Sequence, residues 1–217
     1  MRIALFTCLA LTQADDGFVP LFNGKDLDGW VQKGGKAKYR VEDGVVVGSS
    51  VPDTTNSFLC TAKEYGDFVL ELQFKVDPAL NSGVQIRSQC FDEAKEVEAG
   101  GKKFKIPAGR VHGYQVEIDP SARAYSGGIY DEGRRGWLAD LKGNEAARKA
   151  FKAGDWNAFK VECRGASIKT WINGTAAADL TDDVTPKGFI ALQVHGVGKK
   201  TEPLEVRWRN LRIKELR

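Results

Sequence analysis

The feature that most constrains the fold is an alternation of apolar and polar side chains, which recurs in short segments along the whole chain. The segment FVLELQFKV, residues 68–76, alternates in this way, and so does GVQIRSQ, residues 83–89. Successive side chains of a strand point to opposite faces, so the pattern predicts strands with one buried face. The dipeptides Asp43-Gly44 and Asn173-Gly174 separate such runs and predict two-residue hairpin turns.

Segments of this kind follow one another at short spacing, which predicts an all-β sandwich of two packed antiparallel sheets. Only residues 144–151 have a helical pattern, and Asn144 is the expected N-cap of this short helix. Two longer segments, residues 92–110 and 120–156, interrupt the succession of strands. The second is rich in tyrosine and tryptophan, which disordered segments lack, so we expect it to form an ordered rim or lid.

The first residues, MRIALFTCLALTQADDG, have the pattern of a short export signal. Arg2 precedes an apolar run from Ile3 to Leu11, and Ala14 suits cleavage by a signal peptidase. We therefore expect a signal peptide at residues 1–14, a single domain at residues 15–217, and a periplasmic or secreted protein. A buried first strand is the alternative. No apolar run reaches the roughly 20 residues of a membrane helix, so no membrane span is expected.

Composition and cysteine spacing narrow the range of partners. The net charge of +3 is small, and basic residues are scattered among acidic ones, which argues against a nucleic-acid surface. Cys60, Cys90 and Cys163 follow the expected signal, and either one disulfide or three buried thiols fits this set. Neither zinc-ligand spacing nor a calcium loop occurs, so we expect no metal and no cofactor. The oligomeric state is left open.

Three of the expected strands carry an unusual set of side chains on one face. This set contains amides, carboxylates, an arginine and a histidine but no lysine: Gln85 and Arg87, then Gln115, Glu117 and Asp119, then Gln193 and His195. A solvated face is usually rich in Lys, Ser and Thr, whereas planar groups with several donors and acceptors suit sugar hydroxyls. The pattern favours a ligand-binding face over a structural polar network.

The order of several motifs adds a resemblance that extends from about Phe18 to Leu216. The motifs are GFVPLFNGKDLDGW, NSGVQIR, GYQVEIDP, SGGIYDEGRRGWL, GDWNAFKVECRGASIKTWINGTAAADL, GFIALQVHG and VRWRNLRIKEL. Together they resemble the 3-keto-disaccharide hydrolase domain family. The resemblance implies a concanavalin A-like jelly-roll sandwich, often exported, which cleaves glycosides that another enzyme has oxidised to a ketone at the third sugar carbon.

The ketone of such a substrate suggests a chemistry for the polar face. It acidifies the proton on the second carbon, so a base can remove that proton and the aglycone can leave from the first carbon; water then adds back. His195 or Glu117 is the expected base, Arg87 the partner of the developing oxyanion, and the other titratable group the acid. Direct hydrolysis by Glu117 and Asp119 is the rival route. Structural alternatives remain, because Asp119 can cap a turn and Arg87 can pair with Glu117.

The segment GGIYDEGRRGW, in the second long interruption, is expected to form a rim of the sugar site. Its predicted contacts with the oxidised sugar are Tyr130, Asp131, Arg135 and Trp137, and the alternative is a solvated loop tip. At the level of the whole protein, the alternative to an enzyme is a non-catalytic carbohydrate-binding module. The density of titratable groups on the polar face favours the enzyme.

Overall fold

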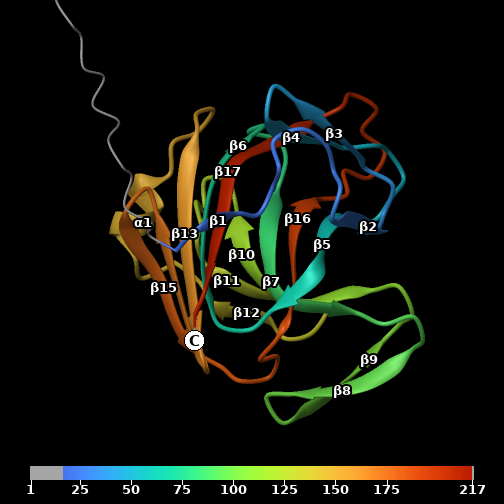
Figure 1. Cartoon of the computed structure of the whole chain (residues 1–217), viewed down its shortest axis with the longest axis vertical. Coiled ribbons are helices and arrows are strands. Elements are labelled where there is room, and N and C mark those ends of the chain that lie inside the picture. The colour runs from blue at the N-terminus through green and yellow to red at the C-terminus, as the bar shows by residue number, and fades with distance from the viewer. Residues whose placement is uncertain (1–16, 217) are drawn as a thin grey trace, which may run out of the picture.

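The computed structural model describes residues 17–216 and contains two large antiparallel sheets packed face to face (Figure 1). The eight-stranded sheet has the order β15 (Thr175–Thr181), β14 (Ser167–Ile172), β13 (Asn157–Arg164), β6 (Phe68–Val76), β17 (Glu205–Glu215), β4 (Val45–Ser49) and β3 (Lys38–Glu42), and β1 (Val19–Pro20) also pairs with β17. The seven-stranded sheet has the order β12 (Gly136–Ala139), β11 (Ile129–Glu132), β10 (Val111–Ile118), β7 (Ser82–Cys90), β16 (Gly188–Val194), β5 (Ser57–Tyr65) and β2 (Trp30–Gly34). The predicted jelly-roll sandwich is confirmed.

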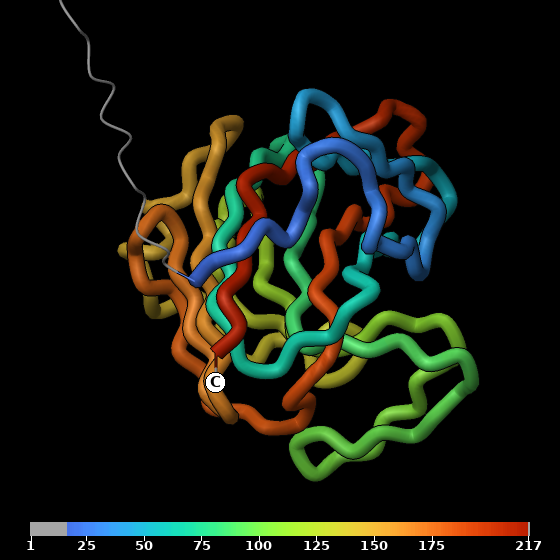
Figure 2. The backbone as a smooth tube through the Cα atoms, in the orientation of Figure 1, coloured from blue at the N-terminus to red at the C-terminus, as the bar shows by residue number. Residues whose placement is uncertain are grey.

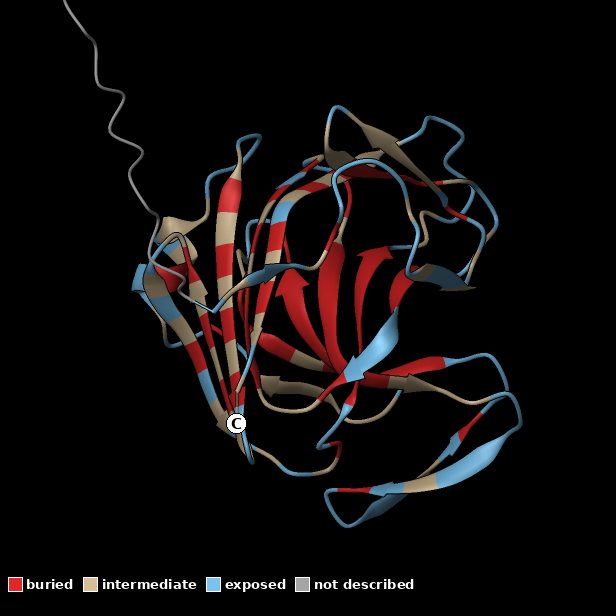
Figure 3. Cartoon of the chain, in the orientation of Figure 1, coloured by how far each residue is buried: buried red, intermediate tan, exposed pale blue. Residues whose placement is uncertain are grey.

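The hydrophobic core lies between the two sheets and follows the alternation seen in the sequence. In β6, Phe68, Leu70, Leu72 and Phe74 are buried in it. The seven-stranded sheet contributes inward-facing residues from its central strands, namely Val84, Ile86, Tyr114, Val116, Ile118, Leu192 and Val194. Figure 3 shows that these central strands are buried along almost their whole length, so the outer face of this sheet is also covered.

Local sequence signals account for the turns and the short helix. Asp43-Gly44 joins β3 to β4, and Asn173-Gly174 joins β14 to β15, with positive φ angles at all four residues. The helix α1 spans Glu145–Ala150, and the side chain of Asn144 accepts a hydrogen bond from the backbone N–H of Ala147 at 3.1 Å. Both hairpins and the helix are therefore where the sequence predicts them.

The two long interruptions form hairpins. Residues 95–106 fold into a separate two-stranded sheet, β8 (Lys95–Ala99) and β9 (Lys102–Ile106), which projects from the sandwich (Figure 2). Residues 129–139 form β11 and β12, which pair with each other and extend the seven-stranded sheet next to β10. The segment predicted as a rim or lid is thus a continuation of the sheet edge, and its closure over a ligand stays a prediction.

A β-bulge in β7 changes the direction of one predicted site residue. The pairing of β7 with β10 shifts register between His112 and Tyr114, and its pairing with β16 shifts between Phe189 and Ala191. Arg87 lies at this irregularity with a φ of 45°, in the left-handed region. Because a bulge rotates the following side chains, the simple alternation from Gln85 to Arg87 does not hold.

The predicted signal peptide at residues 1–14 lies outside the described residues. Among residues 17–216, no helix is long and apolar enough to cross a membrane. Cys60, Cys90 and Cys163 are all free thiols, which resolves the alternatives left by the sequence in favour of thiols over a disulfide. Burial raises the pKa of Cys60 and Cys163 to about 12, so both are protonated at neutral pH.

Candidate functional site

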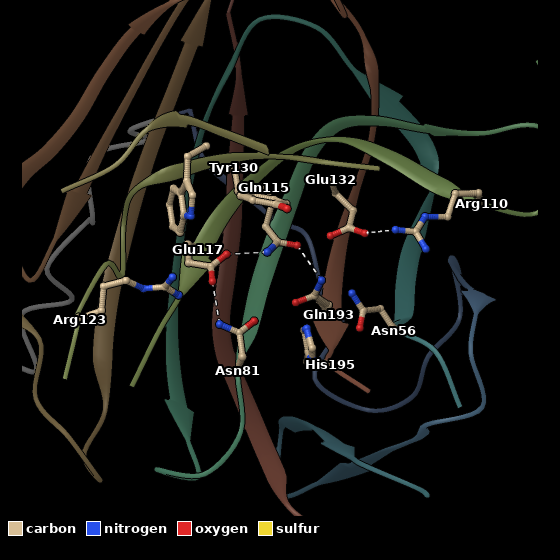
Figure 4. Close-up of a pocket in the computed structure, with 11 residues that line it drawn as sticks. Asn56, Asn81, Arg110, Gln115, Glu117, Arg123, Tyr130, Glu132, Gln193 and His195 are labelled. Carbon is tan, nitrogen blue, oxygen red and sulfur yellow. Dashed lines mark hydrogen bonds and ion pairs between the residues drawn. The ribbon is translucent and has the colours of Figure 1, made fainter. Parts of the chain in front are cut away.

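A cavity of about 550 Å³ opens on the outer face of the seven-stranded sheet, the face turned away from the core. More than half of its lining residues come from strands β10, β11, β12 and β16, and the others come from loops and strand ends (Figure 4). Its lining is almost entirely polar or aromatic: Asn56, Asn81, Arg110, Gln115, Glu117, Arg123, Tyr130, Glu132, Trp137, Gln193 and His195. This composition suits a ligand rich in hydroxyl groups.

Glu117 is a buried carboxylate at one end of the cavity. The residue is only 5% exposed, and its carboxylate accepts hydrogen bonds of 2.7 Å from Asn81 Nδ2 and from Gln115 Nε2. Burial raises the pKa of Glu117 above its ordinary value, although the bonds from Asn81 and Gln115 and the charge of Arg123 oppose the shift. A fixed carboxylate with a raised pKa is suited to accept a proton from a bound ligand.

A chain of buried, hydrogen-bonded amide side chains fixes the position of Glu117. Gln115 Oε1 accepts hydrogen bonds from Gln85 Nε2 at 2.7 Å and from Gln193 Nε2 at 2.8 Å. At the far end, Ser88 Oγ donates to Gln85 Oε1 at 2.7 Å. The predicted set of Gln85, Gln115, Glu117 and Gln193 is therefore brought together, with Gln85 beneath the cavity rather than in its wall.

Gly83 makes room for this chain of amides. It pairs with Glu117 across β7 and β10, and a Cβ atom built on it would lie 2.5 Å from Cδ of Gln115. No side chain fits in that space without displacing Gln115. The glycine in the NSG motif is explained by this close approach.

A second carboxylate lies at the other end of the cavity. Glu132 accepts a hydrogen bond from Arg110 Nη2 at 2.7 Å, and burial raises the pKa of Glu132 more than the charges of Arg110 and His195 lower it. Gln115 and Tyr130 are direct partners across β10 and β11, whereas Glu132 pairs with Gly113. Glu117 and Glu132 are thus separated by the Gln115–Tyr130 pair.

Aromatic side chains form the wall beside Glu117. The rings of Tyr130 and Trp137 meet edge to face with centroids 5.4 Å apart, and Trp137 meets Tyr125 in the same way at 5.3 Å. The guanidinium of Arg123 lies over the Trp137 ring, 5.3 Å from its centroid. Tyr130 and Trp137 therefore line the cavity as the sequence predicts.

Asp119 is close to the site but holds a loop rather than facing the cavity. It accepts a hydrogen bond from Arg123 Nε at 2.8 Å and others from the backbone N–H groups of Ser121 and Tyr125. Burial acts to raise the pKa of Asp119, but these three bonds together lower it below its ordinary value. The expected placement of Asp119 among the reacting groups is corrected: its carboxylate positions Arg123, which does line the cavity.

His195 follows the last residue of β16 and lies at the open side of the cavity (Figure 4). Its side chain is exposed, and Nδ1 is 2.8 Å from the carbonyl oxygen of Gly196. This contact suits the tautomer in which Nδ1 carries a proton, and it leaves Nε2 for a ligand. His195 thus shares the cavity with Glu117, and its catalytic role stays a prediction.

Arg87 does not lie in the cavity with Glu117 and His195, so its expected role as the partner of the developing oxyanion is wrong. Its guanidinium is fully buried and donates to the carbonyl oxygens of Gly66 and Gly165 and to Asp67, at 2.7, 2.7 and 2.8 Å. The bulge in β7 turns this side chain away from the cavity, so its partner is Asp67 and not Glu117. Arg87 ties β7 to two loops.

Asp131 and Arg135 also lie outside the cavity, contrary to the expectation for the rim. In β11, alternation directs Tyr130 and Glu132 to the cavity and Asp131 to the opposite side. Asp131 is fully buried and pairs with Arg134 at 2.7 Å and with Arg135 at 2.5 Å. Arg135 continues to Asp182 at 2.7 Å, so this set anchors the hairpin structurally.

Sequence reasoning missed five residues of the cavity wall: Asn56, Asn81, Arg110, Arg123 and Glu132. Glu132 could have been found by applying the period of two from Tyr130. The other four lie in loops or at strand ends, where no periodic pattern indicates direction. Among residues 17–216, no cluster of three or more His, Cys, Asp or Glu side chains has an arrangement that could hold a metal ion.

Comparisons with known proteins identify a family and a distant relative. The sequence profile of the 3-keto-alpha-glucoside-1,2-lyase-like domain matches residues 17–214. A curated relative from Bacteroides thetaiotaomicron, named 3-keto-disaccharide hydrolase, is 22% identical over an alignment that covers 100% of this chain and 84% of the relative.

Solved structures share the fold. A candidate glycosyl hydrolase from Parabacteroides distasonis superimposes with a TM-score of 0.62 at 20% identity, covering 97% of this chain and 99% of its own. The carbohydrate-binding module CBM66 from Bacillus subtilis superimposes with a TM-score of 0.58 at 16% identity, covering 86% of this chain and 96% of its own. Because one is a candidate hydrolase and the other a binding module, the shared fold does not decide the function.

Proposed function

The chain belongs to the family of 3-keto-alpha-glucoside-1,2-lyase-like domains, and from that membership we propose that it cleaves the glycosidic bond of 3-keto-glycosides. The observation that carries the proposal is Glu117, a buried carboxylate with a raised pKa, fixed by two amides in the wall of a polar cavity. The name of the Bacteroides relative supports the same substrate class.

The proposed reaction is an elimination followed by hydration. The base removes the proton from the second carbon of the oxidised ring, and the electron pair of that C–H bond forms a double bond to the first carbon. The bond from the first carbon to the glycosidic oxygen breaks, and this oxygen leaves with a proton. Addition of water across the double bond then yields the free 3-keto-sugar.

Three residues of the cavity fit the roles that this route needs. Glu117 is the proposed base, and Arg123 beside it is the proposed cation for the developing enolate oxygen, replacing Arg87. His195, at the open side where a leaving group can depart, is the proposed proton donor. The charge of His195 acts to lower the pKa of Glu132, so the two side chains interact across the cavity.

Carboxylate spacing favours elimination over direct hydrolysis by a pair of acids. Asp119 is engaged by Arg123 and lies outside the cavity wall, which removes the rival pair of Glu117 and Asp119. Glu132 pairs with Gly113, four residues from Glu117 along β10, so the two α carbons are about 13 Å apart. Side chains stand roughly perpendicular to a sheet, so we expect the carboxyl groups of Glu117 and Glu132 to be about as far apart as their α carbons. Pairs of hydrolytic carboxyl groups lie only about 5–9.5 Å apart, which disfavours this pair.

The direct test is to incubate the purified protein with the 3-keto and the ordinary form of one glycoside. We expect cleavage of the 3-keto form alone, because only its second carbon is acidic enough for Glu117. Cleavage of neither form, together with binding of the ordinary form, would assign the cavity to a carbohydrate-binding module. Equal cleavage of both forms would contradict the elimination.

We also propose that the protein is exported, on the basis of the signal-like residues 1–14. Expression of the full chain with a C-terminal tag, followed by cell fractionation and N-terminal sequencing, tests this. We expect a periplasmic or secreted product that begins near residue 15. A product that keeps Met1 and stays in the cytoplasm would refute export.

A further inference from the structure

We infer that the side-chain oxygens of Asn81 and Gln193 together receive one hydroxyl group of the sugar, and that the ketone oxygen binds elsewhere in the cavity. The inference rests on the proposed function for the identity of the ligand as an oxidised sugar. It adds the orientation of that sugar and names Gln193 as a residue that determines specificity.

The orientation of the amides follows from the charge of Glu117. An ionised carboxylate only accepts hydrogen bonds, so Asn81 and Gln115 must each turn an NH2 group toward it, as observed at 2.7 Å. Gln115 then has only its oxygen left for its neighbours. Gln193 must therefore turn its own NH2 group toward Gln115, as observed at 2.8 Å.

This chain of constraints leaves two acceptors directed at the ligand. Gln193 is fully buried, and its Oε1 has no hydrogen-bond partner among the described residues. Asn81 donates from Nδ2 to Glu117, which turns its Oδ1 away from that carboxylate, and no described residue donates a hydrogen bond to this Oδ1. Figure 4 shows the oxygen ends of Asn81 and Gln193 turned toward the space between them.

The neighbouring side chains do not supply the missing donor. Asn56 Oδ1 accepts from the backbone N–H of Gly196 at 3.0 Å and His195 Nδ1 is 2.8 Å from the carbonyl oxygen of Gly196, and neither side chain donates to Gln193 Oε1. A buried acceptor that loses water without gaining a donor is unfavourable by about 1–3 kcal/mol. A ligand that displaces water from this place is therefore favoured only if it brings a donor.

Sugar groups differ in what they can donate. A hydroxyl group donates and accepts, whereas a ketone oxygen only accepts. A ketone placed between two amide oxygens would repel both of them. The ketone is thus directed to the cationic part of the wall, where Arg123 lies beside Glu117, and a hydroxyl of the same ring faces Gln193.

The test compares a 3-keto-glycoside with analogues in which one ring hydroxyl at a time is replaced by hydrogen or by fluorine. For one position, we expect the wild-type kcat/KM to fall at least about tenfold for both analogues, because neither can donate. For the same position, the kcat/KM of the Gln193→Met variant should differ less than twofold between the hydroxyl substrate and the analogues. Gln73→Met, on the outer face of the other sheet, is the matched control and should behave as wild type.

Two outcomes would overturn the inference. One is a fluorinated analogue that is as good a substrate as the hydroxyl compound at every position, which needs only the wild-type protein. The other is an equal loss for the analogues in wild type and in Gln193→Met. If no 3-keto-glycoside is cleaved, calorimetric binding of the analogues tests the inference separately, so its failure is distinguishable from failure of the proposed function.

Discussion

The outer faces of the two sheets are both polar, but they are polar in different ways. On the eight-stranded sheet, charged side chains such as Glu71 and Arg212 form ion pairs in contact with solvent, with side-chain exposures of 31% and 42%. On the seven-stranded sheet, Gln85, Gln115 and Gln193 are almost completely buried and bond to one another. Polarity alone therefore does not distinguish a binding face from a solvated one.

The two faces differ physically because buried polar groups need hydrogen-bond partners within the protein, whereas exposed ones can bond to water. An exposed ion pair contributes about 0–1 kcal/mol and can be replaced without consequence for the fold. Buried amides must have their donors and acceptors matched, so each one restricts the orientation of the next. A buried polar network that ends in an unmatched acceptor at a cavity, as at Gln193, indicates a place kept for a ligand.

Replacing one carboxylate on each face should give the largest contrast. We expect Glu117→Gln to lower kcat on a 3-keto-glycoside by about 10²–10⁴, because the proposed base is lost. The control Glu71→Gln should stay within twofold of wild type. In the wild-type protein, kcat/KM should rise with pH through an apparent pKa above the usual value of 4.5, since burial raises the pKa of Glu117. Full activity of Glu117→Gln would refute the assignment.

His195 provides the next contrast, because it lies at the open side of the cavity rather than in the buried network. His195→Gln should keep the melting temperature and lose about 10² in turnover, within the range of general acid catalysis. The loss should shrink for substrates with a leaving group of low pKa, which departs without a proton. A lowered melting temperature with turnover within a few-fold of wild type would return His195 to a structural role.

Glycine substitutions test whether the network needs its present geometry. Gly83→Ala places a methyl group 2.5 Å from Cδ of Gln115, so Gln115 must move and release Glu117. We expect at least about a tenfold loss of kcat/KM, in line with misplacement of a catalytic group. Gly143→Ala is the matched control, because nothing lies within 4 Å of the added atom. Equal activities of the two variants would show that the position of Gln115 is unimportant.

Arginine substitutions separate stability from activity. Arg87→Met leaves two carbonyl oxygens and Asp67 without their buried donor, so we expect a loss of about 3 kcal/mol in the free energy of unfolding. Arg212→Met removes a half-exposed pair and should cost at most about 1 kcal/mol. Urea titration measures both. Turnover per folded molecule should be unchanged in Arg87→Met, and a large loss there would restore Arg87 to the site.

The last contrast concerns His112, which is fully buried next to the cavity hairpin and whose ring lies tilted against Phe91, with centroids 4.8 Å apart. Burial, with the charge of Arg134, lowers the pKa of His112 from 6.5 to about 4. Below pH 6.5 the unfolded chain therefore binds a proton at His112, whereas the folded chain binds it only near pH 4. The free energy of unfolding falls as the pH is lowered from 6.5 to 4. His112→Phe should show a shallower decline of melting temperature from pH 6.5 to 4, and parallel curves would contradict this.

The sequence predicted the sandwich well because alternation reports directly on which face of a strand is buried. It placed β6, both two-residue hairpins and the Gln115–Glu117 stretch correctly. It failed at Arg87, because a bulge with a left-handed residue leaves no signal in a pattern of period two. It also failed at Asn81 and Arg123, which loops bring into the cavity from outside the regular strands.

The central claim is that Glu117 removes a proton from the second carbon of a 3-keto-sugar. The most direct measurement is cleavage of a 3-keto-glycoside in D2O, with the released sugar analysed by NMR at early times and the remaining substrate as the control. The account predicts one deuterium at the second carbon of the product, delivered during hydration, and much less in the unreacted substrate. Product that keeps its original hydrogen at that carbon would show direct hydrolysis and contradict the account.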